Sequence, residues 1–439
     1  MVVNIINRKR LAFATSLICW FLSLILPHFQ GNMTLTFVIF QIVLSTVLFL
    51  AVKEVLSHEI FISDLKAKLV LLAIIVIHFL SLFLVKIEIS QPYILWNRFG
   101  SGTMLKNDQI FSFGDLAHLT TAASCSKQTL IGEILCDPFD RVFNQNPHVV
   151  EFMRLTHLNN LFILGVISTL LFYLSIFLIV LKFKRVRSQI LTIIVSPPLI
   201  LALDRGNEIL TITFIIFGLY LISSQNKFYL VGYFLLGLSA VFKVWPIFLV
   251  FFILVINFKK LDWLAKILLS IPIIYWIIFY RNIVGMISFT QYRSPNGLSF
   301  GLRHYLNKTL EPSFLIAFVL FITLSFFYFL RRISMQSTPH QLLINLLTPL
   351  YLTYISIWIS GIHFSYRLVI LIPILFLLPV WEKSNICVLL VNSLIVTVFI
   401  TARLSVTTAL TALLALIFCI LVLKDVDPNY RHKITKLFK

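Results

Sequence analysis

The stretch FYLVGYFLLGLSAVFKVWPIFLVFFILVIN, residues 228–257, decides how this chain is threaded. It reads either as one long helix or as two short apolar runs, 228–242 and 244–257. Lys243 and Pro246 interrupt it, and proline ends or kinks a helix because it lacks a backbone N–H. We therefore expect a helical hairpin whose tip lies near Lys243–Pro246.

The distribution of basic residues also favours the hairpin. With a cytoplasmic N-terminus and a hairpin at 228–257, most of the 36 Lys and Arg residues fall on one side of a membrane. This is the positive-inside pattern of membrane proteins. If residues 228–257 formed a single span, every later loop would lie on the opposite side of the membrane. Lys259, Lys260, Arg331 and Arg332 would then be outside.

The composition is that of a membrane protein. Of the 439 residues, 59% are hydrophobic and only 12% are charged, whereas soluble domains carry about 25% charged residues. We expect an all-α fold, a polytopic membrane helical bundle of about 12–14 spans. The net charge of +19 does not indicate nucleic-acid binding, because the basic residues lie between apolar segments. The apolar runs lie at 11–27, 34–52, 67–86, 158–181, 188–203, 209–224, 228–242, 244–257, 263–280, 313–330, 341–360, 366–381, 385–402 and 405–423.

These runs divide the chain into four parts. The first long outside loop is expected to carry short surface helices, one of them from Asp115 to Thr129. The parts are N-terminal membrane helices at 1–86, an outside catalytic loop at 87–157, a membrane helical bundle at 158–423 with a second outside loop at 281–312, and a basic cytoplasmic tail at 424–439.

Asp115 is the candidate general base. A carboxylate at the membrane surface can take the proton of an acceptor hydroxyl as that hydroxyl attacks. The residues after it, Leu-Ala-His-Leu, also allow Asp115 to be read as the N-cap of a helix.

Three cations, Arg205, Lys243 and Arg367, are expected on the same outer side and together suit an anionic lipid headgroup. The stretch Asp204-Arg-Gly-Asn-Glu208 also reads as a tight turn whose acid and base neutralise each other. Lys243 could instead pair internally with Asp204 or Glu208, and Arg367 could reach the headgroups by snorkelling. Trp245 is typical of an interfacial anchor.

Cys125 and Cys136 fall in the outside loop. In an oxidising compartment they are expected to form a disulfide, with two free thiols as the alternative. The five cysteines show no metal-ligand spacing, so we expect no metal site and no cofactor, although a divalent metal is not excluded. The 281–312 loop is expected to be a lid or an acceptor-binding surface.

Several motifs resemble those of a known superfamily. These are Gly114-Asp-Leu116 at the first long outside loop, Asp204-Arg-Gly-Asn-Glu208, and GLSAVFKVWP at 237–246. Cys136-Asp-Pro, Arg141-Val-Phe-Asn144 and Tyr366-Arg-Leu368 add to them. Over residues 110–380 the chain resembles the C-type-fold membrane glycosyltransferases that use polyprenyl-phosphate sugars, and is most similar to family 87, the bacterial polyprenyl-phosphate mannosyltransferases.

The resemblance implies a role for each matching residue. Asp115 matches the catalytic base, Arg205 and Lys243 match positions near the lipid phosphate, and Arg367 is expected to join them. The sequence departs from the family at Asn144-Gln-Asn-Pro147, where relatives have Asn-Tyr-Pro, and at Ser365, where relatives have an acid. The expected substrate-binding residues are Asp204, Asn207, Glu208, Asn144 and Tyr366.

The expected activity is inverting transfer of a monosaccharide from a polyprenyl-phosphate donor to a glycolipid or polysaccharide acceptor. The expected location is the bacterial inner membrane, with the active site facing the periplasm or cell exterior. The partners would be the donor, the acceptor and the lipid bilayer, without nucleic acid. A flippase or transporter of lipid-linked sugars and a polysaccharide polymerase are the alternatives.

Overall fold

The structure is a computed structural model of the chain. It describes residues 64–86, 113–125, 131, 136, 145–182, 190–191, 194, 199, 202–203, 206–223, 227–290, 346, 349–350, 352–353 and 356.

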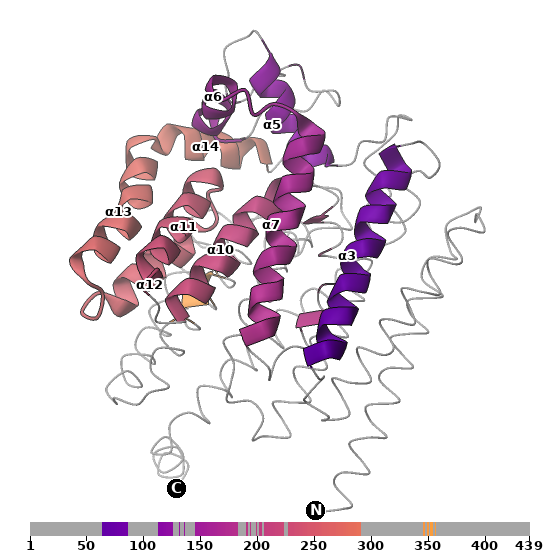
Figure 1. Cartoon of the computed structure of the whole chain (residues 1–439). Coiled ribbons are helices and arrows are strands. Elements are labelled where there is room, and N and C mark those ends of the chain that lie inside the picture. Colours follow the sequence, from indigo (N-terminus) through magenta and orange to yellow (C-terminus); the bar gives the residue numbers. More distant parts are fainter. Residues whose placement is uncertain are drawn as a thin grey trace, which may run out of the picture.

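Every element in these described ranges is an α-helix, as the all-α prediction requires (Figure 1). Most of the helices begin and end within three residues of an apolar run of the sequence, whereas the short helices at 114–124, 147–155 and 280–290 match no such run. They are α3 (Asp64–Lys86), α5 (Gly114–Ser124), α6 (Pro147–Leu155), α7 (Leu161–Lys182), α10 (Asn207–Ser223), α11 (Tyr229–Phe242), α12 (Ile247–Asn257), α13 (Trp263–Ile278) and α14 (Tyr280–Thr290).

The centre of the described bundle is a row of helices in which α10 packs between α7 and α11, and α11 also packs on α13. The α10–α11 contact is close because glycines face each other across it. A Cβ atom added to Gly232 would lie 2.6 Å from the carbonyl oxygen of Gly218. Small residues at a crossing bring two helix backbones together, as is common in membrane helices.

One described helix, α7, is both long and apolar enough to cross a membrane. A second would qualify if α13 and α14, which meet at 73°, formed one bent span. The apolar parts of α3, α10, α11 and α12 are shorter. The number of spans therefore stays a prediction.

The hairpin predicted for residues 228–257 is confirmed. Helix α11 ends at Phe242 and α12 begins at Ile247. The hydroxyl of Tyr229, which begins α11, is hydrogen-bonded to Asp262, which follows the end of α12. The two helices are therefore antiparallel, with Lys243–Pro246 as the tip.

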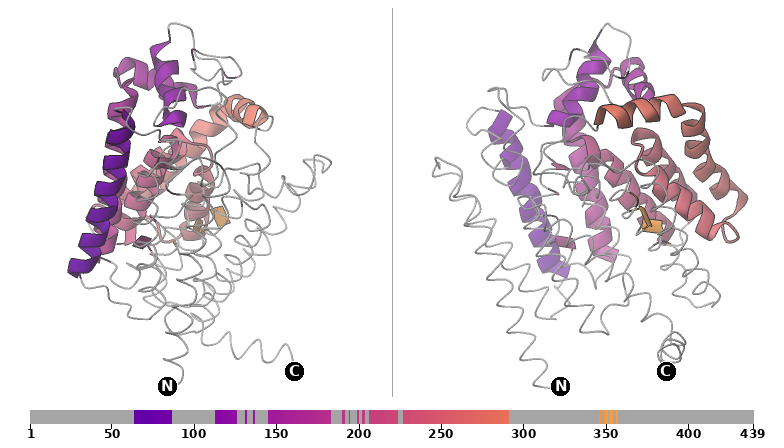
Figure 2. Two further views of the ribbon diagram at one scale, coloured as in Figure 1. Left: turned by 90° about the vertical axis from the view of Figure 1, so that its right-hand side faces the viewer. Right: turned by 180° about the vertical axis from the view of Figure 1, so that it is seen from behind.

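A separate layer caps one end of the bundle. Figures 1 and 2 show α5, α6 and α14 at the same end of the bundle, which is also the end where α7 begins. The α5–α6 contact is a small hydrophobic core formed by Phe113, Leu116, Leu119, Ala122, Ala123, Val149, Val150 and Met153.

One predicted boundary at this end was wrong. The helix expected from Asp115 to Thr129 ends at Ser124, because Cys125 has an extended backbone (φ −75°, ψ 138°). The segment predicted as an outside loop from 281 begins within a helix, α14, which continues to Thr290. Hydropathy alone does not predict this helix, because its apolar residues form no run long enough to span a membrane.

Asp262 is the N-cap of α13 and gives a test of this part of the fold. Its carboxylate accepts a hydrogen bond from the Ala265 N–H at 2.8 Å. Burial would raise the pKa of Asp262, but the hydrogen bonds from Ala265 and Tyr229 outweigh it and hold the pKa below its ordinary value. The ionised carboxylate therefore stabilises the fold.

Asp262→Ala is expected to lower the free energy of unfolding by about 1 kcal/mol at pH 7, as loss of an N-cap does. Because the folded-state pKa is depressed, the stabilisation is present above the unfolded-state pKa and is lost as pH falls through the folded-state pKa. Thermal unfolding of both proteins in detergent between pH 3 and pH 7 measures this. A difference that grew on acidification would contradict the assignment.

Candidate functional site

Phe113 fixes the beginning of α5. Its side chain is fully buried, and its backbone is left-handed, with φ 66° and ψ 38°. Its ring fills the space that a Cβ atom on Gly165 of α7 would occupy. A bulky residue holds such a backbone only where packing enforces it. The position of the next turn is therefore set by Phe113.

Asp115 is the second residue of α5, and the N-cap is Phe113. The alternative in which Asp115 is the N-cap is therefore wrong. The structure describes the backbone of Asp115 and not its side chain.

The turn before α10 lies against the beginning of α5. Gly206 is left-handed, with φ 72°, and its N–H donates to the carbonyl of Ala202 at 3.0 Å. A Cβ atom on Gly206 would lie 3.0 Å from Cδ1 of Phe113 and 3.3 Å from Cβ of Leu116. Phe113 and Leu116 flank Asp115 and its glycine neighbour. The motif at 204–208 and the motif at 114–116 are thus in contact.

Glu208 joins the same region to the hairpin tip. Its side chain is 1% exposed, and Oε2 accepts a hydrogen bond from Nε1 of Trp245 at 2.9 Å. Trp245 is itself buried. Its prediction as an interfacial anchor was wrong, because its indole N–H has a buried carboxylate as partner.

Lys243 lies at the tip, half-buried, one residue after α11. Its ammonium donates to the side-chain oxygen of Gln145 at 2.5 Å. Gln145 belongs to the stretch 144–147, near the end of the segment predicted to be the long outside loop. The hairpin tip and the end of that loop are therefore next to each other.

Asn146 holds this contact in place. It is 2% exposed, its amide donates to the Val241 carbonyl at 2.7 Å, and its side-chain oxygen accepts from Tyr275 Oη at 2.9 Å. The same oxygen accepts from the His148 N–H at 3.1 Å, which makes Asn146 the N-cap of α6. Sequence reasoning missed Asn146, although Asn followed by Pro is a common helix start.

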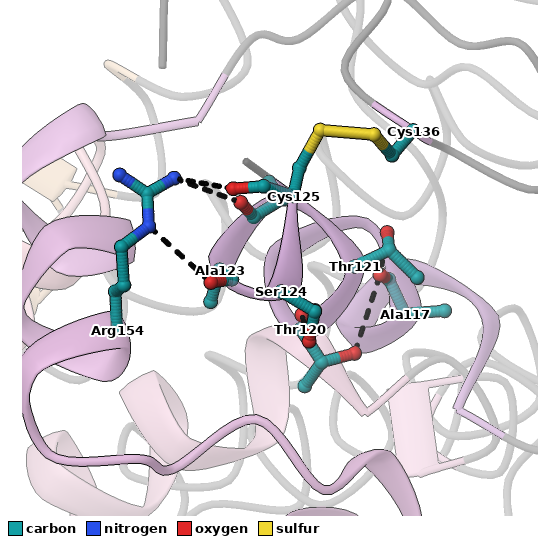
Figure 3. The surroundings of a disulfide bond; sticks show 9 residues. Ala117, Thr120, Thr121, Ala123, Ser124, Cys125, Cys136 and Arg154 are labelled. Carbon is teal, nitrogen blue, oxygen red and sulfur yellow. Dashed lines mark hydrogen bonds between the residues drawn. A yellow bond between two sulfur atoms is a disulfide. The ribbon is translucent and has the colours of Figure 1, made fainter. Parts of the chain in front are cut away.

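The other end of α5 is held by covalent and polar contacts (Figure 3). Cys125 and Cys136 form the expected disulfide, with an S–S distance of 2.09 Å. Arg154 of α6 donates to the last carbonyls of α5, those of Ala122, Ala123 and Cys125. It also pairs with Glu151 at 2.7 Å. A cation at a helix C-terminus is favourable.

The other expected site residues are placed only in part. Among the described residues there is no group of three or more His, Cys, Asp or Glu side chains that could hold a metal ion. The backbone of Asn207 begins α10, but its side chain is not described. Asn144, Asp204, Arg205, Tyr366 and Arg367 lie outside the described residues.

Comparison with known proteins gave no relative: no family model, no curated protein and no solved structure matches this chain.

Proposed function

We propose that this protein is an inverting glycosyltransferase of the bacterial inner membrane. It moves a monosaccharide from a polyprenyl-phosphate donor to a glycolipid or polysaccharide acceptor at the outer face. The observation that supports the proposal most is the contact of Gly206 with Phe113 and Leu116. It joins the helix turn of the candidate base to Gly206, which follows Arg205 in the sequence.

In the proposed reaction, Asp115 takes the proton of an acceptor hydroxyl while the hydroxyl oxygen attacks the anomeric carbon. The new C–O bond forms as the bond between that carbon and the phosphate oxygen breaks, with inversion. The polyprenyl phosphate leaves with the bonding electrons. Fixed cations stabilise the charge that develops on it. Lys243 is the described cation, and Arg205 and Arg367 are proposed to act with it.

Lys243 is suited to this role by its surroundings. Its ammonium donates a hydrogen bond to the side-chain amide oxygen of Gln145 at 2.5 Å. Gln145 is a neutral acceptor, and a lysine ammonium can donate up to three hydrogen bonds. The proposed donor phosphate lies between the hairpin tip and residues 204–208.

Purified protein in lipid nanodiscs, given radiolabelled polyprenyl-phosphate sugars with mannose first, tests the function. We expect transfer to an acceptor fraction from the membranes of the same bacterium, and none from nucleotide sugars. Lys243→Met is expected to raise the donor KM about tenfold, since a charge-assisted hydrogen bond contributes about 1.5 kcal/mol.

Lys227→Met is the matched control, because Lys227 is an exposed lysine in the turn before α11, at the opposite end of that helix from Lys243. It should leave the donor KM unchanged. Equal effects of the two substitutions, or use of nucleotide sugars alone, would count against the proposal.

A further inference from the structure

The chain turns sharply where α13 ends. Helices α13 and α14 meet at 73° around Phe279, and Figures 1 and 2 show α14 running across the end of the bundle. A stripe of large apolar side chains on α13 is exposed along the whole helix. It comprises Trp263, Leu264, Ile267, Ile271, Ile274, Ile277 and Ile278.

Aromatic residues mark both ends of this stripe. Trp263 is 67% exposed at one end and Tyr280 is 56% exposed at the other. The helix between them, α13 from Trp263 to Ile278, is about 24 Å long at 1.5 Å per residue, against a hydrocarbon thickness of about 30 Å, and Tyr280 lies just beyond its end. Tryptophan and tyrosine are the residues that gather at the two membrane interfaces.

The charges follow the same boundaries. Lys259 and Lys260 precede Trp263, and no charged residue lies between Lys266 and Arg281. The ammonium of Lys266 lies 4.5 Å from the centre of the Phe258 ring, so it reaches back towards the polar turn. This is how a lysine inside a membrane boundary snorkels to the interface.

Helix α14 has one edge on the protein and one edge free. On the packed edge Met286 is buried, and a Cβ atom on Gly285 would lie 3.0 Å from Ile131, which belongs to the disulfide-closed loop 125–136. On the other edge Tyr280 and Val284 are 56% and 61% exposed. Arg281 is exposed beside them, with Nε 3.5 Å from Tyr280 Oη.

We propose that α14 is an interfacial helix that binds the outer-leaflet surface of a phospholipid bilayer. Tyr280 and Val284 lie in the boundary between headgroups and acyl chains, and Arg281 reaches the lipid phosphates. An apolar edge flanked by a cation is the pattern of helices that lie in this plane. The bend at Phe279 marks the outer membrane boundary. This surface is distinct from the sugar-transfer site and does not depend on transfer.

Spin labelling tests the proposal in reconstituted full-length protein. Cys19, Cys387 and Cys419 are replaced by serine, the Cys125–Cys136 disulfide is kept, and a nitroxide is attached to Val284→Cys, Ile274→Cys or Lys260→Cys. Collision with oxygen, which concentrates in lipid, is compared with collision with a water-soluble nickel chelate. Lys260 supplies the water reference and Ile274 the lipid reference.

We expect the oxygen-to-nickel accessibility ratio at Val284 to lie between the two references and well above that of Lys260. A ratio equal to that of Lys260 would overturn the proposal, as would inaccessibility to both reagents.

A second measurement uses the unmodified protein. Diazirine-bearing phospholipid should label Tyr280 or Val284 on irradiation, and labelling of α13 without α14 would overturn the proposal. Neither measurement requires transferase activity, so a failed transfer assay would not change the result of either one.

Discussion

Asp115→Asn is expected to lower the rate of sugar transfer by about 10²–10⁴-fold, the usual contribution of a general base. The amide keeps the size of the carboxylate but takes no proton from the acceptor hydroxyl. The fold should be unaffected, because the N-cap of α5 is Phe113 and the helix start is held by Phe113 packing. The loss should fall on kcat, with donor KM nearly unchanged.

Asp262→Asn is the matched control. It makes the same chemical change at an acid that caps α13, and asparagine caps a helix about as well as aspartate. Transfer by this variant should equal that of the wild type. Full activity of Asp115→Asn would remove Asp115 from the mechanism, and an equal loss in both variants would indicate a general effect on the fold.

Gly165→Val is expected to destabilise the protein by about 3 kcal/mol, the upper part of the usual range for overpacking. The added Cβ atom would occupy the position of the ring of Phe113, which is fully buried. Either α7 or the first turn of α5 has to move. Thermal unfolding in detergent measures the loss.

A compensating variant separates this cause from a general helix effect. Phe113→Ala removes the ring that the new side chain would meet, so Gly165→Val should cost less in the Phe113→Ala background than in the wild type. Gly285→Ala is a milder comparison, since its Cβ atom would come no closer than 3.0 Å to its nearest neighbour, Ile131. Additive effects of Gly165→Val and Phe113→Ala would contradict direct contact.

The packing of Phe113 also helps to fix how the segments of the candidate site lie relative to one another. The side chain of Phe113 packs against Gly165 and Gly206. Glu208 accepts a hydrogen bond from Trp245, and Gln145 accepts one from Lys243. These contacts link the long outside loop, the turn before α10 and the hairpin tip. A one-residue change of register in any of them would separate Asp115 from the proposed phosphate position.

The sequence by itself determined the helical class, the hairpin at 228–257 and most helix limits in the described part of the chain. Hydropathy and charge placement act locally, so a run of apolar residues and a proline are enough to define α11 and α12. The disulfide followed from two cysteines in one polar loop. The contacts of Gly206 with Phe113 and Leu116 are consistent with the predicted common side of the motifs at 114–116 and 204–208.

Only the tertiary structure decided which side chains meet. Phe113 read as an ordinary apolar residue, yet its left-handed backbone depends on glycines from two other segments. Asn146 and Trp245 acquired their roles from partners about 130 and 37 residues away in the chain. No apolar run in the sequence predicts the bend at which α14 begins. Such features depend on packing between segments that are distant in the sequence, and local sequence patterns do not predict which segments will pack together.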